Sequence, residues 1–185
     1  MEYNSDKYGS GLIGEYEKIL LPYKDRTIKY LEVGIYRGGS LHWASEFFGK
    51  DATIVGIDKD LPPEQDFPEN IKIFVANQSN EIQLKEVADN YKEFDIIIDD
   101  GCHETAETGN TFDALYSYLK TGGVYIIEDF GANMLPKFKG MFVGMPEMVH
   151  HIAIMAKQLD ISRYEIKHNF NFGNGSYAAF WKGNA

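Results

Sequence analysis

Two adjacent carboxylates and an imidazole follow a strongly apolar stretch near the middle of this chain of 185 residues. The isoleucines at 96–98 lead directly into Asp99 and Asp100, and His103 stands three residues after Asp100. Neighbouring carboxylates repel each other and resist removal from water, so their position at the end of a buried segment requires compensation. A bound cation would provide it, and we expect this stretch to form the centre of a site.

A second acidic pair, Glu128 and Asp129, follows the next predicted strand along the chain, residues 124–127. The carboxyl ends of parallel strands meet at one edge of a sheet, where open α/β sheets bind their ligands. If the two strands are neighbours, Asp100 meets this pair there, with His103 beside it. Oxygen ligands with a single histidine suit Mg²⁺, or Mn²⁺ or Ca²⁺, better than zinc. The sequence therefore predicts a metal site made by Asp100, Glu128 and Asp129.

His103 is the candidate general base of such a site. A cation that is coordinated by a substrate hydroxyl lowers the pKa of that hydroxyl, and a histidine can take the proton as the oxygen attacks a methyl sulfonium. The alternative is a loop histidine that only bonds a neighbouring carboxylate. Asp99 has two open roles, as a hydrogen-bond acceptor behind the metal site or as a residue that faces a cofactor.

The hydrophobic pattern predicts alternating strands and helices, which is typical of a parallel sheet with helices on both faces. Strands are predicted at 28–33, 52–57, 71–75 and 124–127, with a central strand that begins at Phe94. Helices are predicted at 12–23, 41–48, 81–91, 105–119 and 146–159. Two further strand-like runs, 164–170 and 177–181, flank a hairpin connection at 172–175. We therefore predict an α/β, Rossmann-like class I methyltransferase domain whose mostly parallel, seven-stranded sheet ends in an antiparallel hairpin.

A glycine turn lies between the first predicted strand and the next helix. Its backbone amides, including those of Gly34, Gly38 and Ser40, could bind a carboxylate or phosphate group at the helix N-terminus. Tyr36 stands where the Gly-x-Gly-x-x-Gly pattern of dinucleotide-binding proteins requires a glycine, so a nicotinamide or flavin cofactor is disfavoured. Alternatively, the segment is a tight turn without a ligand.

Two acidic residues flank this turn in the predicted fold. Asp58 ends the second strand, where a carboxylate can accept hydrogen bonds from a ribose diol, and Glu32 precedes the turn. Together they favour an adenosine-containing ligand with a short charged tail. S-adenosylmethionine fits this description better than a dinucleotide, whereas a solvated loop aspartate is the alternative for Asp58.

Length and composition predict one domain, residues 1–185, in which residues 1–24 form an N-terminal segment and helix that cap the site. The formal net charge is −10 and no run of Lys or Arg occurs, which argues against a nucleic-acid partner. No stretch is apolar for long enough to span a membrane. The single cysteine, Cys102, and the polar N-terminus without a secretory signal predict a cytoplasmic protein with no membrane partner.

Four segments, in order, resemble the class I O-methyltransferases of macrolide and rhamnosyl sugars, of the mycinamicin and macrocin type, and their cephalosporin hydroxylase-like relatives. They are residues 31–41, 55–58, 95–103 and 122–129, and residues 5–9 are similar to the N-terminal signature of that family. The Asp-Asp-Gly-x-His pattern together with the Glu-Asp pair is far more specific than the glycine turn.

The resemblance implies a metal, a base, a methyl donor and an assembly state. It implies that Mg²⁺ is held by Asp100, Glu128 and Asp129, with His103 as general base. It implies an S-adenosylmethionine site that includes Glu32, Asp58 and Gln78. It also implies homo-oligomers. The chain departs from the family at Asn77, where an aspartate is usual, and the resemblance does not identify the acceptor.

The leading hypothesis is metal-dependent methyl transfer from S-adenosylmethionine to a hydroxyl of a sugar or another small polyol. A binding domain that assembles without turnover and a cephalosporin hydroxylase-like partner are the alternatives. The intact carboxylate set and His103 favour catalysis, because a pure binding domain does not need a base beside a metal. A Met- and Phe-rich segment, 134–145, is predicted to be a lid over the acceptor, a subunit interface or part of the core.

Overall fold

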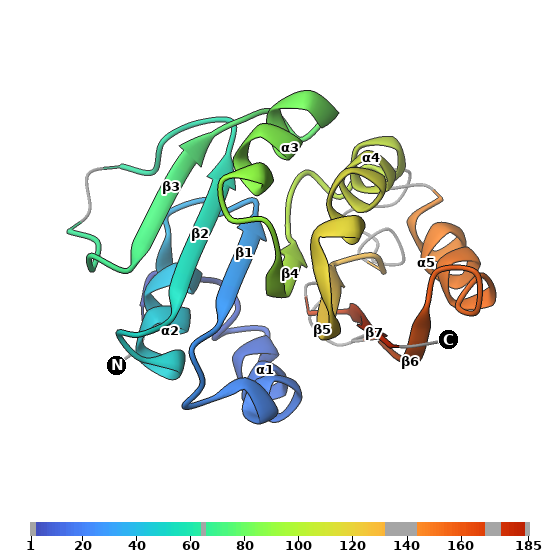
Figure 1. The fold of residues 1–185 in the computed structure, drawn as a ribbon, viewed down its shortest axis with the longest axis horizontal. Coiled ribbons are helices and arrows are strands. Elements are labelled where there is room, and N and C mark those ends of the chain that lie inside the picture. Colours follow the sequence, from blue (N-terminus) through green and yellow to red (C-terminus); the bar gives the residue numbers. More distant parts are fainter. Residues whose placement is uncertain (1–2, 64–65, 132–143, 169–174, 184–185) are drawn as a thin grey trace.

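The computed structural model describes residues 3–63, 66–131, 144–168 and 175–183. Within these residues, seven strands form one sheet in the order β3-β2-β1-β4-β5-β7-β6 (Figure 1). They are β1 (Lys29–Val33), β2 (Thr53–Asp58), β3 (Ile71–Val75), β4 (Phe94–Asp99), β5 (Leu119–Glu128), β6 (Ile161–Lys167) and β7 (Tyr177–Lys182). Strands β1 to β5 pair in parallel, and β7 pairs antiparallel with both β5 and β6. The predicted sheet is therefore confirmed.

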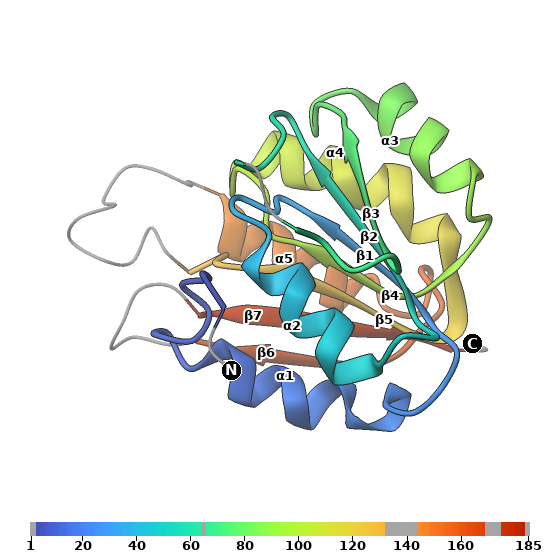
Figure 2. The same ribbon diagram turned by 90° about the vertical axis from the view of Figure 1, so that its left-hand side faces the viewer.

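Five helices of the described residues cover the two faces of the sheet (Figure 2). Helices α1 (Leu12–Leu20) and α2 (Gly39–Phe48) pack on one face, and α3 (Glu81–Asp89), α4 (Thr105–Leu115) and α5 (Met145–Ile154) pack on the other. The predicted helix 12–23 ends earlier than expected, because the chain tightens into a 3₁₀ turn that contains Pro22. The predicted helix 105–119 likewise gives way to a 3₁₀ turn at Tyr116–Tyr118.

Strand β5 is longer than the predicted strand 124–127. It begins at Leu119, which pairs with Phe94 of β4 across a register shift before the regular ladder starts. The predicted hairpin connection at 172–175 and the Met- and Phe-rich segment 134–145 both lie mostly outside the described residues. Gly144 and Met145 are the described residues of segment 134–145, and Met145 is buried in the core at the start of α5.

Strand β4 lies at the centre of the core, and all six of its residues are buried. Ile96 and Ile98 pack with α1 and α2, whereas Ile97 packs with α3, α4 and α5 on the opposite face. Each fully buried isoleucine contributes roughly 1.5–3 kcal/mol through removal of its side chain from water. This two-sided burial fixes where β4 ends, and so it places Asp99 and Asp100 at the C-terminal edge of the sheet.

The segment before α1 crosses this same edge. Its backbone closes two turns, in which Ser10 N–H donates to Asp6 O (3.0 Å) and Gly11 N–H donates to Tyr8 O (3.2 Å). Tyr3 ties the segment to α2, because its ring stacks on His42 with 5.2 Å between ring centroids. The stack with His42 holds the N-terminal segment beside α2, and Lys7 of this segment lies next to Glu32, Asp100 and Glu128 at the ends of β1, β4 and β5.

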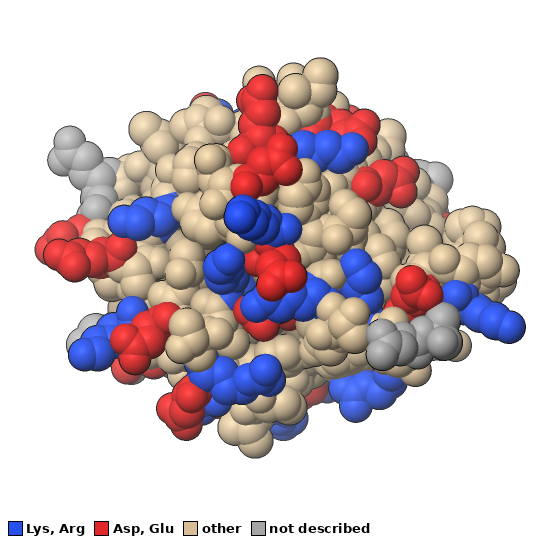
Figure 3. Space-filling model, viewed as in Figure 1, with Lys and Arg blue, Asp and Glu red and all other residues tan. Residues whose placement is uncertain are grey.

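None of the described helices is both long enough and apolar enough to cross a bilayer. On the face shown in Figure 3, acidic and basic side chains alternate over short distances instead of forming a stripe of one sign.

Gly34, the first residue after β1, is held at a close approach of two loops. Its φ is +87°, and its N–H donates to Ile57 O at 2.8 Å. A Cβ at this position would overlap the backbone of Asp100 and Gly101. The sequence left open whether this glycine approaches a ligand or only forms a tight turn, and the packing of the β1 loop against the β4 loop by itself requires a glycine here.

We predict that Gly34→Ala lowers the free energy of unfolding by roughly 2–4 kcal/mol, because left-handed strain adds to a steric overlap. Gly11→Ala is the matched control. Gly11 has a similar φ of +78°, but no other atom lies near its would-be Cβ, so a loss of roughly 1–2 kcal/mol is expected. Urea denaturation of both variants measures the difference, and equal losses would show that the close approach carries no energetic weight.

Candidate active site

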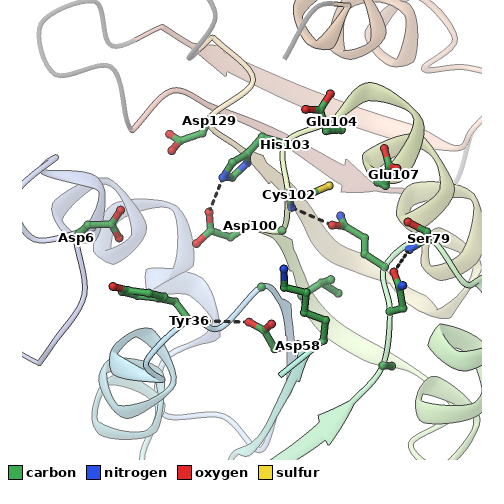
Figure 4. A pocket seen from close by; sticks show the side chains of 17 residues that line it. Asp6, Tyr36, Asp58, Ser79, Asp100, Cys102, His103, Glu104, Glu107 and Asp129 are labelled. Carbon is green, nitrogen blue, oxygen red and sulfur yellow. Dashed lines mark hydrogen bonds and ion pairs between the residues drawn. The ribbon is translucent and has the colours of Figure 1, made fainter. Parts of the chain in front are cut away.

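A cavity of about 590 Å³ opens at the C-terminal edge of the sheet (Figure 4). Its wall comes from the loops that follow β1 to β5 and from the N-terminal segment. Six residues that the sequence predicted for the site line this cavity: Gly34, Asp58, Gln78, Asp100, His103 and Asp129. Five others do not line it: Glu32, Gly38, Ser40, Asp99 and Glu128.

Asp100 lies between the cavity and the protein interior. Its N–H donates to Val33 O at 2.8 Å, which fixes the backbone at the end of β4. One carboxylate oxygen, Oδ2, contacts the ammonium group of Lys7, and the other, Oδ1, lies 3.8 Å from His103 Nε2. The side chains of Asp100 and His103 are each about one-fifth exposed, so both are accessible from the cavity.

Asp129 completes a group of three side chains on this wall. Asp100, His103 and Asp129 each offer a possible ligand atom, and these three atoms lie within 4.8 Å of one another (Figure 4). Asp129 Oδ1 accepts the N–H of Gly175 at 2.5 Å, which ties the β5 loop to the residues before β7. Burial, together with the charge of Asp100, raises the pKa of Asp129 to about 6. A group of two carboxylates and one imidazole suits a hard cation.

Two of these residues have a strained backbone. The φ angles of His103 and Asp129 are +57° and +52°, a left-handed conformation that costs a non-glycine residue roughly 1–3 kcal/mol. Both residues line the cavity near Asp100 (Figure 4). Strain of this kind concentrates at functional sites, where the surrounding structure maintains it.

Glu128 lies on the interior side of Asp100. Its two carboxylate oxygens accept hydrogen bonds from Lys7 Nζ at 2.7 and 2.8 Å, and Tyr16 donates its hydroxyl to the same carboxylate. Burial raises the pKa of Glu128 well above its usual range, and the nearby charge of Asp100 adds to this. The structure thus divides the predicted metal set: Asp100 and Asp129 reach the cavity, whereas Glu128 faces Lys7.

Lys7, which lies behind the cavity wall, is a residue that the sequence analysis did not identify. It is 3% exposed, and its Nζ also lies 3.5 Å from Glu32 Oε1. Burial opposes the charged form of Lys7, but the carboxylates of Asp100, Glu128 and Glu32 outweigh this effect and raise its pKa well above the usual value. The similarity of residues 5–9 to a known signature was the only signal in the sequence, and it gave this lysine no role.

The residues around the glycine turn have mainly internal partners. Asp58 lines the cavity, but its Oδ2 accepts the N–H groups of Ile35 (2.9 Å) and Tyr36 (3.0 Å) and so holds the turn in place. Glu32 is completely buried and accepts the Tyr30 hydroxyl at 2.7 Å. At the start of α2, Gly38 adopts a φ of +78° and Ser40 is buried. The turn is therefore rigid before any ligand binds.

Gln78 joins two loops of the cavity wall. Its Nε2 donates to Asp99 Oδ1 at 2.7 Å, and its Oε1 accepts the N–H of Cys102 at 3.0 Å. Burial raises the pKa of Asp99 to about 8. Asp99 is buried behind the cavity wall, and both roles predicted for it stay predictions.

We predict that Gln78→Leu lowers the free energy of unfolding by roughly 1–3 kcal/mol, because the buried Asp99 carboxyl and the Cys102 amide lose their partner. Gln158→Leu, at an exposed position, is the control and should change stability by less than about 0.5 kcal/mol. Thermal and urea unfolding measure both values. A Gln78 variant as stable as the Gln158 variant would show that this bridge is dispensable.

Known proteins share both the sequence pattern and the fold, although no family model matches the chain. It is 30% identical over 150 residues to 8-demethyl-8-alpha-L-rhamnosyl tetracenomycin-C 2'-O-methyltransferase of Streptomyces olivaceus, covering 77% of this chain and 39% of that protein. It is 33% identical over 150 residues to demethylmacrocin O-methyltransferase of Streptomyces fradiae, covering 75% and 37%. The chain thus spans about two fifths of the length of these curated relatives.

Among solved structures, the MycE methyltransferase of the mycinamycin biosynthetic pathway, in complex with Mg, SAH and mycinamycin VI, superimposes with a TM-score of 0.76. It is 26% identical, with 92% of this chain and 48% of that chain covered. A putative caffeoyl-CoA O-methyltransferase from Staphylococcus aureus, at 17% identity and a TM-score of 0.63, shares the fold alone. These findings confirm the resemblance seen in the motifs: the chain has a Rossmann-like methyltransferase fold and is related to the class I O-methyltransferases of macrolide and rhamnosyl sugars.

Proposed function

We propose that this chain transfers a methyl group from S-adenosylmethionine to a hydroxyl of a sugar or another small polyol, with the help of a divalent cation. One observation carries the proposal: Asp100, His103 and Asp129 lie within 4.8 Å of one another on the wall of a cavity that also reaches the glycine turn and Asp58. The similarity to sugar O-methyltransferases supports the same conclusion.

The proposed methyl donor lies between the glycine turn and the β4 loop. Asp58 and Gln78 both line the cavity, and in this proposal Asp58 binds the ribose hydroxyls of the methyl donor. We propose that Glu32, Gly38, Ser40 and Asp99 contribute by shaping this region, because their described contacts are internal. The related MycE structure contains SAH, the product that S-adenosylmethionine leaves after methyl transfer.

The cation site fits Mg²⁺, with Mn²⁺ or Ca²⁺ as alternatives, because its donors are carboxylate oxygens. We propose Asp100 and Asp129 as ligands from the cavity side and Glu128 as the third ligand, which would share its carboxylate with Lys7. When bound, a divalent cation lowers the pKa of a hydroxyl that coordinates it.

His103 supplies the base in this proposal. Its imidazole, accessible from the cavity, takes the proton of the acceptor hydroxyl. The oxygen–methyl bond forms as the sulfur–methyl bond of the sulfonium breaks, SAH departs, and the proton passes from His103 to solvent. Asp100, 3.8 Å from His103 Nε2, stabilises the imidazolium that forms in this step.

The wider setting of the reaction is part of the same proposal. We propose that residues 1–185 act as one domain whose N-terminal segment caps the site, that the protein forms homo-oligomers in the cytoplasm, and that the acceptor is a small molecule. The curated relatives are longer than the matched region, and the residues of those relatives outside it have no counterpart in this comparison.

Calorimetry and an acceptor screen test this function directly. The chain should bind S-adenosylmethionine but not NAD, and it should methylate at least one acceptor in a panel of sugars and nucleotide sugars when Mg²⁺ is present. EDTA should abolish turnover, and added Mg²⁺ should restore it. Binding of NAD alone would contradict the proposal, and binding of the methyl donor with no turnover on any acceptor would favour a binding domain.

We predict that His103→Asn lowers turnover by roughly 10²–10⁴-fold, the usual contribution of a general base. Asparagine is chosen because it tolerates the left-handed backbone at this position better than alanine. Affinity for SAH should change by less than about threefold, which is under about 1 kcal/mol. His151→Asn, on the exposed side of α5, is the control. A fully active His103 variant would show that this residue is only a loop histidine bonded to a carboxylate.

A further inference from the structure

The ammonium group of Lys7 is surrounded by carboxylates from three neighbouring strands. Glu32 belongs to β1, Glu128 belongs to β5, and Asp100 directly follows β4, which lies between them in the sheet. Lys7 contacts Asp100 and Glu128 directly and approaches Glu32 at 3.5 Å. The buried ammonium group of Lys7 therefore links the ends of the three central strands.

This contact determines which way Asp100 faces. A carboxylate has two oxygens, and Lys7 occupies Oδ2 from the interior, so Oδ1 is the oxygen that remains toward His103 and the cavity. Asp100 and the buried Glu128 are like charges that repel each other, and the ammonium group of Lys7 between them offsets this repulsion. Lys7 thus holds together groups whose own repulsion acts against the site.

The backbone of Lys7 is itself fixed. Its carbonyl accepts the N–H of Ile13 at the start of α1 and the Ser10 hydroxyl, both at 3.2 Å, and its N–H donates to Ser5 Oγ at 3.3 Å. The residue before it, Asp6, lines the cavity. The N-terminal segment therefore delivers the ammonium group from a rigid turn, so the position of the charge is set by the fold.

We propose that Lys7 is a positioning residue for the divalent cation: by binding Asp100 and Glu128 from the interior, it orients Asp100 toward the cation and holds the carboxylates close enough to bind it. This inference rests on the proposed function and assigns a role to a residue outside the predicted metal, base and cofactor sets. If Lys7 only competed with the divalent cation for these carboxylates, removal of its charge would free the carboxylates and raise the affinity for the divalent cation.

The affinity of the full chain for Mn²⁺, measured by electron paramagnetic resonance without any methyl donor, separates these two roles. Lys7→Met keeps the length and apolar stem of the side chain but removes the charge. We expect its affinity for Mn²⁺ to fall by at least about tenfold, while affinity for SAH changes by less than about threefold. Lys18→Met, an exposed lysine on α1 that pairs with Glu15, is the control and should leave both affinities unchanged.

The outcomes are distinct. If the wild-type chain binds no Mn²⁺, the proposed function fails and this inference fails with it. If the wild-type chain binds Mn²⁺ but Lys7→Met binds it equally well or more tightly, the inference alone is overturned. A structural role without connection to the cation would lower the melting temperature and leave the Mn²⁺ affinity of the folded fraction intact.

A measurement on the wild-type chain does not depend on whether the variant folds. Lysine side-chain NMR detects an ammonium group only when its protons exchange slowly with water, as expected for buried Lys7. A positioning residue keeps its carboxylate partners when the cation binds, so its signal should persist on addition of Mg²⁺. Disappearance of the signal on Mg²⁺ addition would mean that the cation expels the ammonium group, and this would overturn the inference.

Discussion

The repulsion between carboxylates at the ends of neighbouring strands is the constraint that the rest of this structure has to satisfy. Parallel strands β1, β4 and β5 bring Glu32, Asp100 and Glu128 to one edge of the sheet, and Asp129 follows immediately. Desolvation makes each of these charges costly unless it is paired. The buried ammonium of Lys7 pairs with three of them, which leaves the cavity side of Asp100 and Asp129 available for a ligand.

The same constraint connects parts of the fold that otherwise look independent. The N-terminal segment crosses the sheet edge, and from there Lys7 contacts Asp100 and Glu128 and approaches Glu32. The close approach at Gly34 joins the β1 and β4 loops, and the hydrogen bonds of Gln78 join the β3 and β4 loops, so these loops support the backbone that carries Asp100. A site keeps its geometry when the side chains that form it are held by packing and by hydrogen bonds from behind.

Much of the fold could be predicted from local patterns in the sequence. The isoleucines at 96–98 indicate a strand buried on both faces, and the side chain alternation between the two core clusters confirms it. The convergence of Asp100, His103 and Asp129 follows from the rule that parallel strands end at one edge. What the sequence could not show is the direction of each side chain. Glu128 ends β5 and faces the interior, where its carboxylate accepts hydrogen bonds from Lys7, whereas Asp129 follows the strand with a left-handed backbone and reaches the cavity.

The most direct test of this account is a crystal structure of the chain soaked with Mn²⁺ and SAH, with anomalous diffraction used to locate the metal. We predict one strong anomalous peak on the cavity wall, within coordination distance of carboxylate oxygens of Asp100 and Asp129, with Glu128 as the third protein ligand. SAH should lie between the glycine turn and Asp58. A Mn²⁺ peak bound by other residues, or none at this wall while SAH occupies the cavity, would contradict the central claim that these strand ends form a cation site.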